Sequence, residues 1–492
     1  MWFLVAGLGQ NVLTPLVIGQ ESFGTFKRAL AFVNVLNNVV VVASIQAVSR
    51  AIAAAPADQR PATLRRATWL HAGVGVGLAT LFFAAVPLIA WYQHAPQLMP
   101  VLRLLALILV AYGVYAPLIG GLNGVGAFGR QAALDATYST LRTVLIAGVG
   151  ALFVARGLGG GAVGATVGFV VAAALIIPVA LAAVRWRGGT ATELAPRAHL
   201  SFLGDLALAQ LFQALLLQVD LVLLGRMATL RGLAQGLDDV AARAAADRLA
   251  GLYAQAQAFG LVPYQILLAG AYVLFPAIAA ARARRDDGAL RDAVRSGGQG
   301  TLLVAGALVA AVGATPLAVL RFAFGRGAAG SLPIDGAAPI LGHLALGHGC
   351  TAIAMVGITL FAAAGRARTA AMLAAAVAAW ATLGAWLGGE LLGGPLDEGV
   401  SLGAHLSLGL AVGLLVGATL VVVAVHRAFG PYVRAASLAR VVVGVALAFV
   451  AGRFVPVPSM RLACALVPVV PLVVYAVAVA LLGEPWPGRR AR

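Results

Sequence analysis

Residues 160–184, GGAVGATVGFVVAAALIIPVALAAV, contain no acidic or basic side chain. An α-helix rises about 1.5 Å per residue, so about 20 such residues cross the hydrocarbon core of a bilayer. The apolar run is continuous rather than alternating, which argues against a strand of a transmembrane barrel. This stretch therefore predicts a membrane-spanning helix.

Comparable stretches fill most of the 492-residue chain. Hydrophobic residues make up 61% of it and charged residues 10%, well below the roughly 25% charged content of soluble domains. We predict an all-α polytopic membrane protein with about 14 transmembrane helices. The expected spans are 2–19, 29–49, 68–92, 101–122, 132–154, 160–184, 200–225, 248–280, 299–320, 338–363, 370–389, 402–425, 439–457 and 461–482.

Two blocks of the first half recur in the second half, each at its own constant spacing. The first block consists of Gly24, Phe26, Ala29 and Phe32, matched by Gly251, Tyr253, Ala256 and Phe259. The second consists of Gly121, Ala127, Gly129, Arg130 and Gly148, matched by Gly357, Ala363, Gly365, Arg366 and Gly384. Six helices separate the copies, so both cross the membrane in the same direction, as a parallel repeat.

The repeat predicts a domain organisation. We expect a six-helix bundle at 1–185, a second six-helix bundle at 186–430, and two appended helices with a basic cytoplasmic tail at 431–492. The formal net charge is +17, but the arginines are scattered over many loops. This distribution favours anionic lipid headgroups of the bilayer over nucleic acid as the partner. Lys and Arg are more numerous in the even-numbered connections, which predicts that both termini are cytoplasmic.

Four segments resemble bacterial polysaccharide and O-antigen flippases. They are IGQESFGTF at 18–26, VDLVLLG at 219–225, the stretch from GLYAQA at 251–256 to Pro276, and AGR at 364–366. These flippases belong to the multidrug/oligosaccharidyl-lipid/polysaccharide (MOP) exporter superfamily. The resemblance implies a MATE-like arrangement of 6+6+2 helices in the bacterial inner membrane.

The same resemblance implies a function. The expected activity is translocation of an undecaprenyl-diphosphate-linked oligosaccharide from the inner to the outer leaflet by alternating access, without enzymatic chemistry. Polysaccharide polymerases or other glycan-assembly proteins are the implied partners. The arginine-rich pattern of helices 1 and 2 in lipid II flippases is absent, so a peptidoglycan precursor is a less expected cargo.

Arg142 is the first candidate for substrate binding. It lies near the middle of the 132–154 span, where a charge costs at least about 3 kcal/mol. Asp135 is about two turns away along the same helix, too far to be a close partner by itself. The second repeat block places Ala371 and Ala378 at the equivalent positions, so the shared architecture does not need this pair. We expect Arg142 to bind an anionic group such as a diphosphate; a structural salt bridge is the alternative.

Polar stripes on two repeat-related helices are the next candidates. Asn34, Asn37 and Asn38 have the i, i+3, i+4 spacing of one helical face, and Asn37 and Asn38 align with Tyr264 and Gln265. Such groups suit a sugar-lined cavity, although polar residues also join helices to each other. Lys27 and Arg28, at the expected outer end of the second helix, are candidates for attracting the anionic lipid head; snorkelling to the interface is the alternative.

Carboxylates inside the spans are candidates for ion coupling. Asp220 shares a predicted helical stripe with Gln210 and Gln213, while Asp205 lies near the inner end of that helix. Together with Asp135, they are groups that can carry H⁺ or bind Na⁺. Pairing of Asp220 with Arg226 is the alternative. The sequence predicts no metal site and no bound cofactor.

Two other functions are alternatives for a chain of this composition. A cation-coupled multidrug exporter of the same superfamily would favour a cavity rich in carboxylates and aromatics, whereas this chain offers Arg142 and amides. A membrane glycosyltransferase or polymerase would need a large outer loop with catalytic carboxylates, and the loops 226–247 and 321–337 are too short for that. No Walker motif is present.

Overall fold

The computed structural model describes residues 2–184, 188, 194–268, 284, 286–325, 331–394, 396 and 401–484. These residues form helices joined by short connections, with no strand among them, and two compact units divide between Gly251 and Leu252. The first unit therefore extends beyond residue 185, because α7, α8 and most of α9 pack with the helices before them. The bundle boundaries at 185 and 430 were inferred from the repeat rather than from packing, and they stay predictions.

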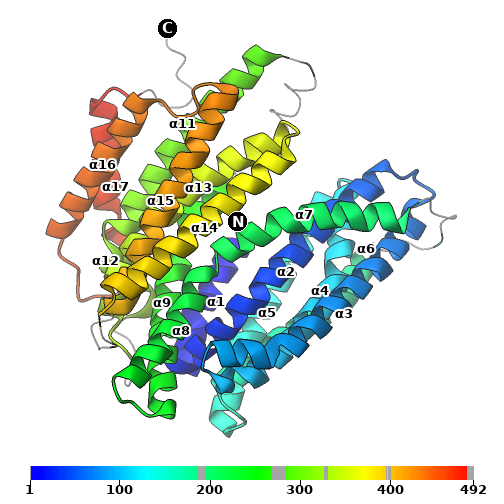
Figure 1. Cartoon of the computed structure of the whole chain (residues 1–492), viewed down its shortest axis with the longest axis horizontal. Helices are drawn as coiled ribbons and strands as arrows, with labels where there is room; N and C mark the ends of the chain where they lie inside the picture. Colours follow the sequence, from blue (N-terminus) through cyan, green and yellow to red (C-terminus); the bar gives the residue numbers. More distant parts are fainter. Residues whose placement is uncertain are drawn as a thin grey trace. The chain divides into compact units, whose positions relative to one another are not determined.

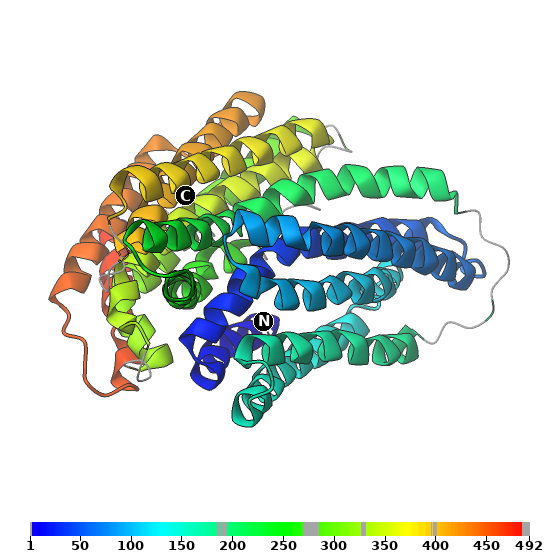
Figure 2. The same cartoon turned by 60° about the horizontal axis from the view of Figure 1, so that its bottom comes forward.

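The first unit is built from long helices that begin and end near glycine or proline. They are α1 (Trp2–Ile18), α2 (Gln20–Ala54), α3 (Arg60–Tyr92), α4 (Met99–Gly124), α5 (Phe128–Arg156), α6 (Gly161–Val184), α7 (Pro196–Leu216), α8 (Val219–Ala234) and α9 (Asp239–Gly260), which continues into the second unit. Within the unit α4 packs against α2, α3 and α6, while α5 pairs with α6 and α1. Helix α7 runs beside α2 (Figures 1 and 2).

In the second unit α11 packs against helices from both ends of the remaining sequence. Its elements are α11 (Asp287–Gly313), the short α12 (Pro316–Phe324), α13 (Ala338–Ala363), α14 (Ala367–Leu387), α15 (Ser401–Phe429), α16 (Ala435–Phe454) and α17 (Val469–Leu481). Helix α13 packs against α11 and α15, and α14 pairs with α15. The predicted appendage, α16 and α17, covers α11.

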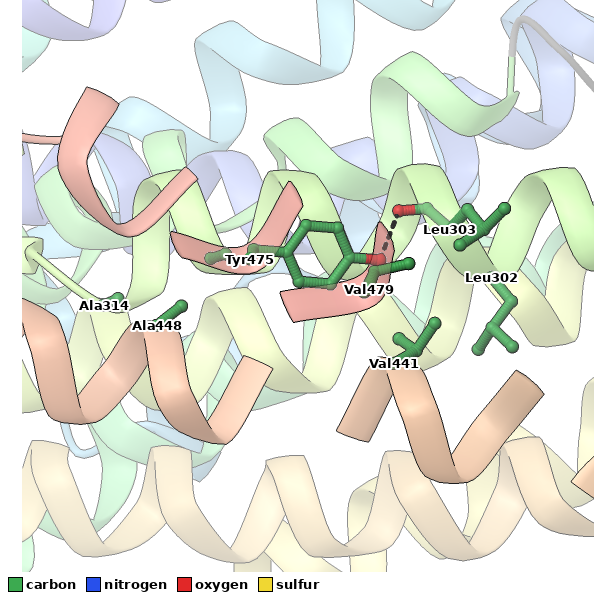
Figure 3. Packing of buried hydrophobic residues seen from close by; sticks show 8 residues of the cluster. Leu302, Leu303, Ala314, Val441, Ala448, Tyr475 and Val479 are labelled. Carbon is green, nitrogen blue, oxygen red and sulfur yellow. Dashed lines mark hydrogen bonds between the residues drawn. The ribbon is translucent and has the colours of Figure 1, made fainter. Parts of the chain in front are cut away.

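Tyr475 shows how the appendage is attached. Its ring is buried against Gly306 of α11, where a Cβ atom would lie 2.5 Å from the tyrosine oxygen. The hydroxyl donates a hydrogen bond of 2.9 Å to the carbonyl of Leu303, and Val441 and Val479 complete the cluster (Figure 3). Glycine in α11 thus makes room for an aromatic anchor, and the appended helices become part of the second unit.

The predicted fold class is confirmed, with corrections to individual spans. Among the described residues, 12 helices are long and apolar enough to cross a membrane. Of the two other predicted spans, 2–19 is the shorter apolar helix α1, and 248–280 lies partly outside the described residues, from 269 onward. The count of 14 therefore stays a prediction. The basic tail after residue 484 also lies outside the described part of the chain.

The predicted span 200–225 is wrong as a single helix. Residues 217 and 218 form a turn that ends α7 and begins α8 at Val219. Asp220 is therefore in the first turn of a new helix, and the periodicity of one regular helix no longer relates it to Gln210 and Gln213. The hydropathy of the stretch was continuous, so the pattern contained no signal for this break.

The structure corrects the pairing of residues in the second repeat block, which the sequence placed three residues out of register. Helices α4 and α13 both end in a tight turn that closes with a glycine at positive φ, Gly126 at 72° and Gly365 at 76°. Matching backbone hydrogen bonds, Gly126 N to Asn123 O and Gly365 N to Ala362 O, confirm this equivalence. The sequence match instead paired Gly365 with Gly129, which lies one turn further on, inside α5. The correct register pairs Gly126 with Gly365.

Candidate functional site

The candidate site in the first unit is organised around α1. Gly19, with φ 82°, separates α1 from α2, and Ile18 fills the space over Gly150 of α5 and Gly161 of α6. A Cβ atom at either glycine would lie within 2.7 Å of the Ile18 side chain. A hydrogen bond of 2.9 Å from Trp2 to Thr140 also joins α1 to α5. Contacts near both ends of α1, by Trp2 and by Ile18, thus fix this helix against α5.

Two basic side chains are held by adjacent residues of α1. Lys27 Nζ of α2 donates to Asn11 Oδ1 at 2.6 Å, and Arg142 Nε of α5 donates to Gln10 Oε1 at 3.0 Å. Both cations are half-buried. Their anchors are consecutive residues in the middle of α1, and the two cations are close enough for Arg142 to act electrostatically on Lys27.

Aromatic side chains surround Arg142. Its guanidinium lies 5.8 Å from the ring centres of both Tyr138 and Phe169, within range of cation–π attraction. Tyr138 also makes a hydroxyl–hydroxyl hydrogen bond with Tyr112, and Tyr115 packs beside both rings. A guanidinium with several donors in such a partly apolar setting is well suited to binding an anion.

Arg28 does not lie in this site, contrary to expectation. Helix α2 begins at Gln20 rather than residue 29, so Arg28 is two turns inside the helix and 1% exposed. It pairs with Asp247 of α9 at 2.5 Å and also donates to Gln93 and Thr229. The role of Arg28 as an exposed lipid-head attractor is wrong, because its guanidinium is enclosed by protein.

The Arg28–Asp247 pair lies beside a close helix crossing. A Cβ atom on Gly24 would lie 1.7 Å from the carbonyl oxygen of Asp247, and one on Gly251 would lie 2.2 Å from that of Gln20. Gly24 and Gly251 are equivalent in the repeat, and each touches the residue four positions before the other. The glycine pair of the first repeat block therefore forms a reciprocal contact between α2 and α9.

The predicted carboxylates occupy three different environments. Asp220 is 1% exposed and its Oδ1 accepts from the Leu221 amide. Asp135 is half-buried and accepts from Gln131 at 3.4 Å, whereas Asp205 is exposed. Arg226, the suggested partner of Asp220, donates to the carbonyl of Tyr92 and stacks over its ring. The three carboxylates thus differ in burial and in their hydrogen-bond partners, and their role in ion coupling stays a prediction.

The residues of the two polar stripes belong to different units. Asn37 is buried, and its Oδ1 has no hydrogen-bond partner within the described residues; Asn34 and Asn38 are half-buried. Tyr264 is buried and Gln265 half-buried, but both belong to the second unit. A shared sugar-lined cavity stays a prediction.

Sequence reasoning missed several residues of the first unit. Gln10 and Asn11 stand in an apolar run, and a polar side chain in such a run is a signal for a buried contact. Asp247 was assigned to a loop because the predicted helix began one residue later. His71 and His199 were not singled out, although an ionisable side chain inside a span is a functional candidate by default.

Solved structures of membrane transporters have the same fold as this chain. An inward-facing multidrug resistance MATE family transporter of the MOP superfamily is 16% identical with a TM-score of 0.68, covering 87% of this chain and 94% of that chain. The lipid II flippase MurJ is 13% identical with a TM-score of 0.65, covering 96% of each chain. A MOP superfamily transporter from Pyrococcus furiosus is 16% identical with a TM-score of 0.55, covering 86% and 91%. The chain has the fold of these transporters.

The family follows from the sequence. Residues 3–281, more than half of the chain, match the model of a family described as polysaccharide biosynthesis protein. The chain belongs to this family and is a multi-pass membrane protein with the MOP-superfamily fold. No curated protein matches it.

Proposed function

We propose that the protein is a flippase that moves an undecaprenyl-diphosphate-linked oligosaccharide from the inner to the outer leaflet of the bacterial cytoplasmic membrane by alternating access. Family membership supports a role in polysaccharide assembly. Both termini are then cytoplasmic, and a polysaccharide polymerase or another glycan-assembly protein receives the product. The protein acts as a transporter and not as an enzyme.

The observation that carries this proposal is the pair of cations, from α2 and α5, that hydrogen-bond to side chains of α1. Lys27 and Arg142 are half-buried and are held by consecutive residues, Asn11 and Gln10. An ammonium and a guanidinium each carry several donors, and a diphosphate presents several oxygens that can accept from both at once. Hydrogen bonds of this charged type contribute about 1.5–3 kcal/mol each. Tyr138 and Phe169 limit access of water to Arg142, which strengthens the attraction. An organic cation would be repelled at this position.

The test compares alanine variants of three basic residues in proteoliposomes. Leaflet exchange of a short undecaprenyl-diphosphate oligosaccharide is measured for the wild type, Arg142→Ala, Lys27→Ala and the control Arg156→Ala. Arg156 is exposed at the end of α5, so its replacement changes the net charge equally. We expect a roughly 10- to 100-fold slower exchange for Arg142→Ala, the equivalent of about 1.4–2.7 kcal/mol, and no change for Arg156→Ala.

Two outcomes would contradict the proposal. Exchange that persists unchanged in a well-folded Arg142→Ala, Lys27→Ala double variant would remove the anion site. A wild type that exports organic cations under a H⁺ or Na⁺ gradient, yet moves none of several lipid-linked glycans, would establish the multidrug exporter instead. Buried Asp220 and half-buried Asp135 are the groups that favour this second candidate.

A further inference from the structure

Two histidines and a serine connect three helices of the first unit. His71 of α3 is 1% exposed, and its Nδ1 lies 2.7 Å from Ser44 Oγ of α2. Its Nε2 lies 2.8 Å from Nε2 of His199 of α7, which is 7% exposed. The rings meet edge to face with centroids 5.1 Å apart. Neither histidine is used by the proposed anion site.

The geometry of the dyad limits how many protons it can hold. Only one hydrogen fits between two Nε2 atoms at this separation, so one ring donates and the other accepts. The two outer Nδ1 atoms can each carry a hydrogen, with the Ser44 hydroxyl accepting from His71. The closed dyad therefore holds at most three hydrogens on four nitrogens, which corresponds to one net positive charge. A fourth would place two N–H groups against each other and break the contact.

Other contacts of α7 with α2 at this level are apolar or cation–π contacts. Leu203 packs between Ala43 and Ala47 of α2, and the Arg50 guanidinium lies 4.3 Å from the ring centre of Phe202. A cavity of about 420 Å³ adjoins the dyad and is lined by residues that include Arg50, Gln59, Thr63, His199 and Phe202. It reaches the connection between α2 and α3, so water has a route to His199.

The surrounding charges leave the histidines as the titrating groups of this contact. Arg50 of α2 is the charged residue among those that line the cavity. Arg65 and Arg66 of α3 and Arg197 and Asp205 of α7 are exposed. Helix α4 presents Gly113 to the carbonyl of His71, where a Cβ atom would be 2.9 Å away.

We propose that His71 and His199 form a proton-binding dyad, loaded through the adjoining cavity, whose full protonation separates α7 from α2 and α3. When the helices are separated, each imidazole can carry hydrogens on both of its nitrogens. The two rings then have two net positive charges, instead of the one that the closed dyad can hold. The separated state thus binds more protons, so it gains population as pH falls. This difference in proton affinity between two conformations is the requirement for coupling a proton to movement. Its link to transport rests on the proposed function; the dyad itself does not.

The test measures hydrogen exchange of α7 in lipid nanodiscs between pH 8 and pH 5, corrected for the intrinsic pH dependence of amide exchange. The wild type is compared with His71→Gln, His199→Gln and the control His343→Gln. His343 is half-buried in α13 and bonds the Ala404 carbonyl and the Ser407 hydroxyl, so the control removes a similar histidine elsewhere. Glutamine keeps hydrogen-bonding capacity but does not titrate in this range.

We expect opening of α7 in the wild type and in His343→Gln to rise as pH falls, by at most about tenfold per pH unit for one additional proton. His71→Gln and His199→Gln should lose this dependence. Exchange that is independent of pH in the wild type, or equally dependent in the dyad variants, would overturn the proposal. No glycan is present in this experiment, so a failure of the flippase proposal leaves its outcome unaffected.

Discussion

Helices α5 and α6 of the first unit and α14 and α15 of the second unit are equivalent pairs with the same packing and different polar content. In the first pair a Cβ atom on Gly168 would lie 2.1 Å from the Leu145 carbonyl oxygen. In the second pair, a Cβ atom on Gly409 would lie 2.1 Å from the carbonyl oxygen of Gly384. Both pairs depend on glycine to bring backbones together.

The polar difference lies on α5. In the register that pairs Gly126 with Gly365, Arg142 corresponds to Ala381 and Asp135 to Ala374, and both alanines are buried. The second pair folds without either charge, so the scaffold does not require them. Charges present in one copy only are therefore candidates for function, provided that they are distinguished from those that hold the first unit together.

The largest expected effect separates a structural charge from a functional one. Asp247→Ala leaves the guanidinium of Arg28 buried without its carboxylate, and breaking such a pair typically costs about 3–5 kcal/mol. Arg142→Ala should leave stability almost unchanged, because Arg142 is half-buried and its Gln10 partner is neutral. Unfolding in mixed lipid–SDS micelles measures both. Equal loss of stability in the two variants would refute the distinction.

The converse substitution tests the second copy. Ala381→Arg introduces a charge at a fully buried position of α14, which should destabilise the protein by at least about 3 kcal/mol. Ala381→Leu is the control for size alone. If the arginine variant is as stable as the leucine variant, the second pair already provides a polar environment and the comparison fails.

The shared packing predicts equal sensitivity in the two pairs. Gly168→Ala and Gly409→Ala each force backbones apart and should cost about 1–3 kcal/mol. Gly148→Ala on α5 is the matched control, because a Cβ atom there meets nothing within 4 Å. The same unfolding assay applies, and a neutral effect at one of the two tight glycines would show that the pairs pack differently.

The smallest expected effect concerns Glu484 in the second unit. Burial raises the pKa of its carboxyl, but hydrogen bonds with Ser437, Arg440 and Gln299 outweigh burial and hold the pKa below the usual 4.5. A group with a lowered pKa stabilises the fold above its unfolded-state value, and this contribution is lost as pH falls through the folded-state value. We expect up to about 1 kcal/mol. Glu484→Gln should flatten stability between pH 5 and pH 3; an unchanged profile would contradict this.

The sequence was sufficient for the fold because each apolar run is long enough to be recognised alone. Helix ends were less predictable: α2 begins well before its apolar segment, at Gln20, and this moved Arg28 from an interface into a buried pair. Short glycine patterns also fit several registers, which is why Gly365 was matched to Gly129 instead of Gly126.

The candidate site was predictable in part. Arg142 was identified from the cost of burying a charge, and Lys27 from its position at the expected outer end of the second helix. Their anchors Gln10 and Asn11 depend on the angle between helices. The pairing of His71 with His199 joins helices far apart in the chain and has no local signature. Contacts of this kind arise from tertiary packing, so composition and spacing cannot contain them.

The reciprocal glycine crossing has an evolutionary consequence. Glu21 and Arg248 are equivalent positions in the register that pairs Gly24 with Gly251, and they form an exposed ion pair of 3.1 Å across the crossing. In a symmetric dimer of a half-length ancestor, identical residues would occupy both positions and repel each other. Opposite charges there need two copies that can differ in sequence, as the two copies within this chain do. The pair thus indicates that the two copies diverged in sequence at these positions. It stabilises contact between two unlike copies but not between two like ones.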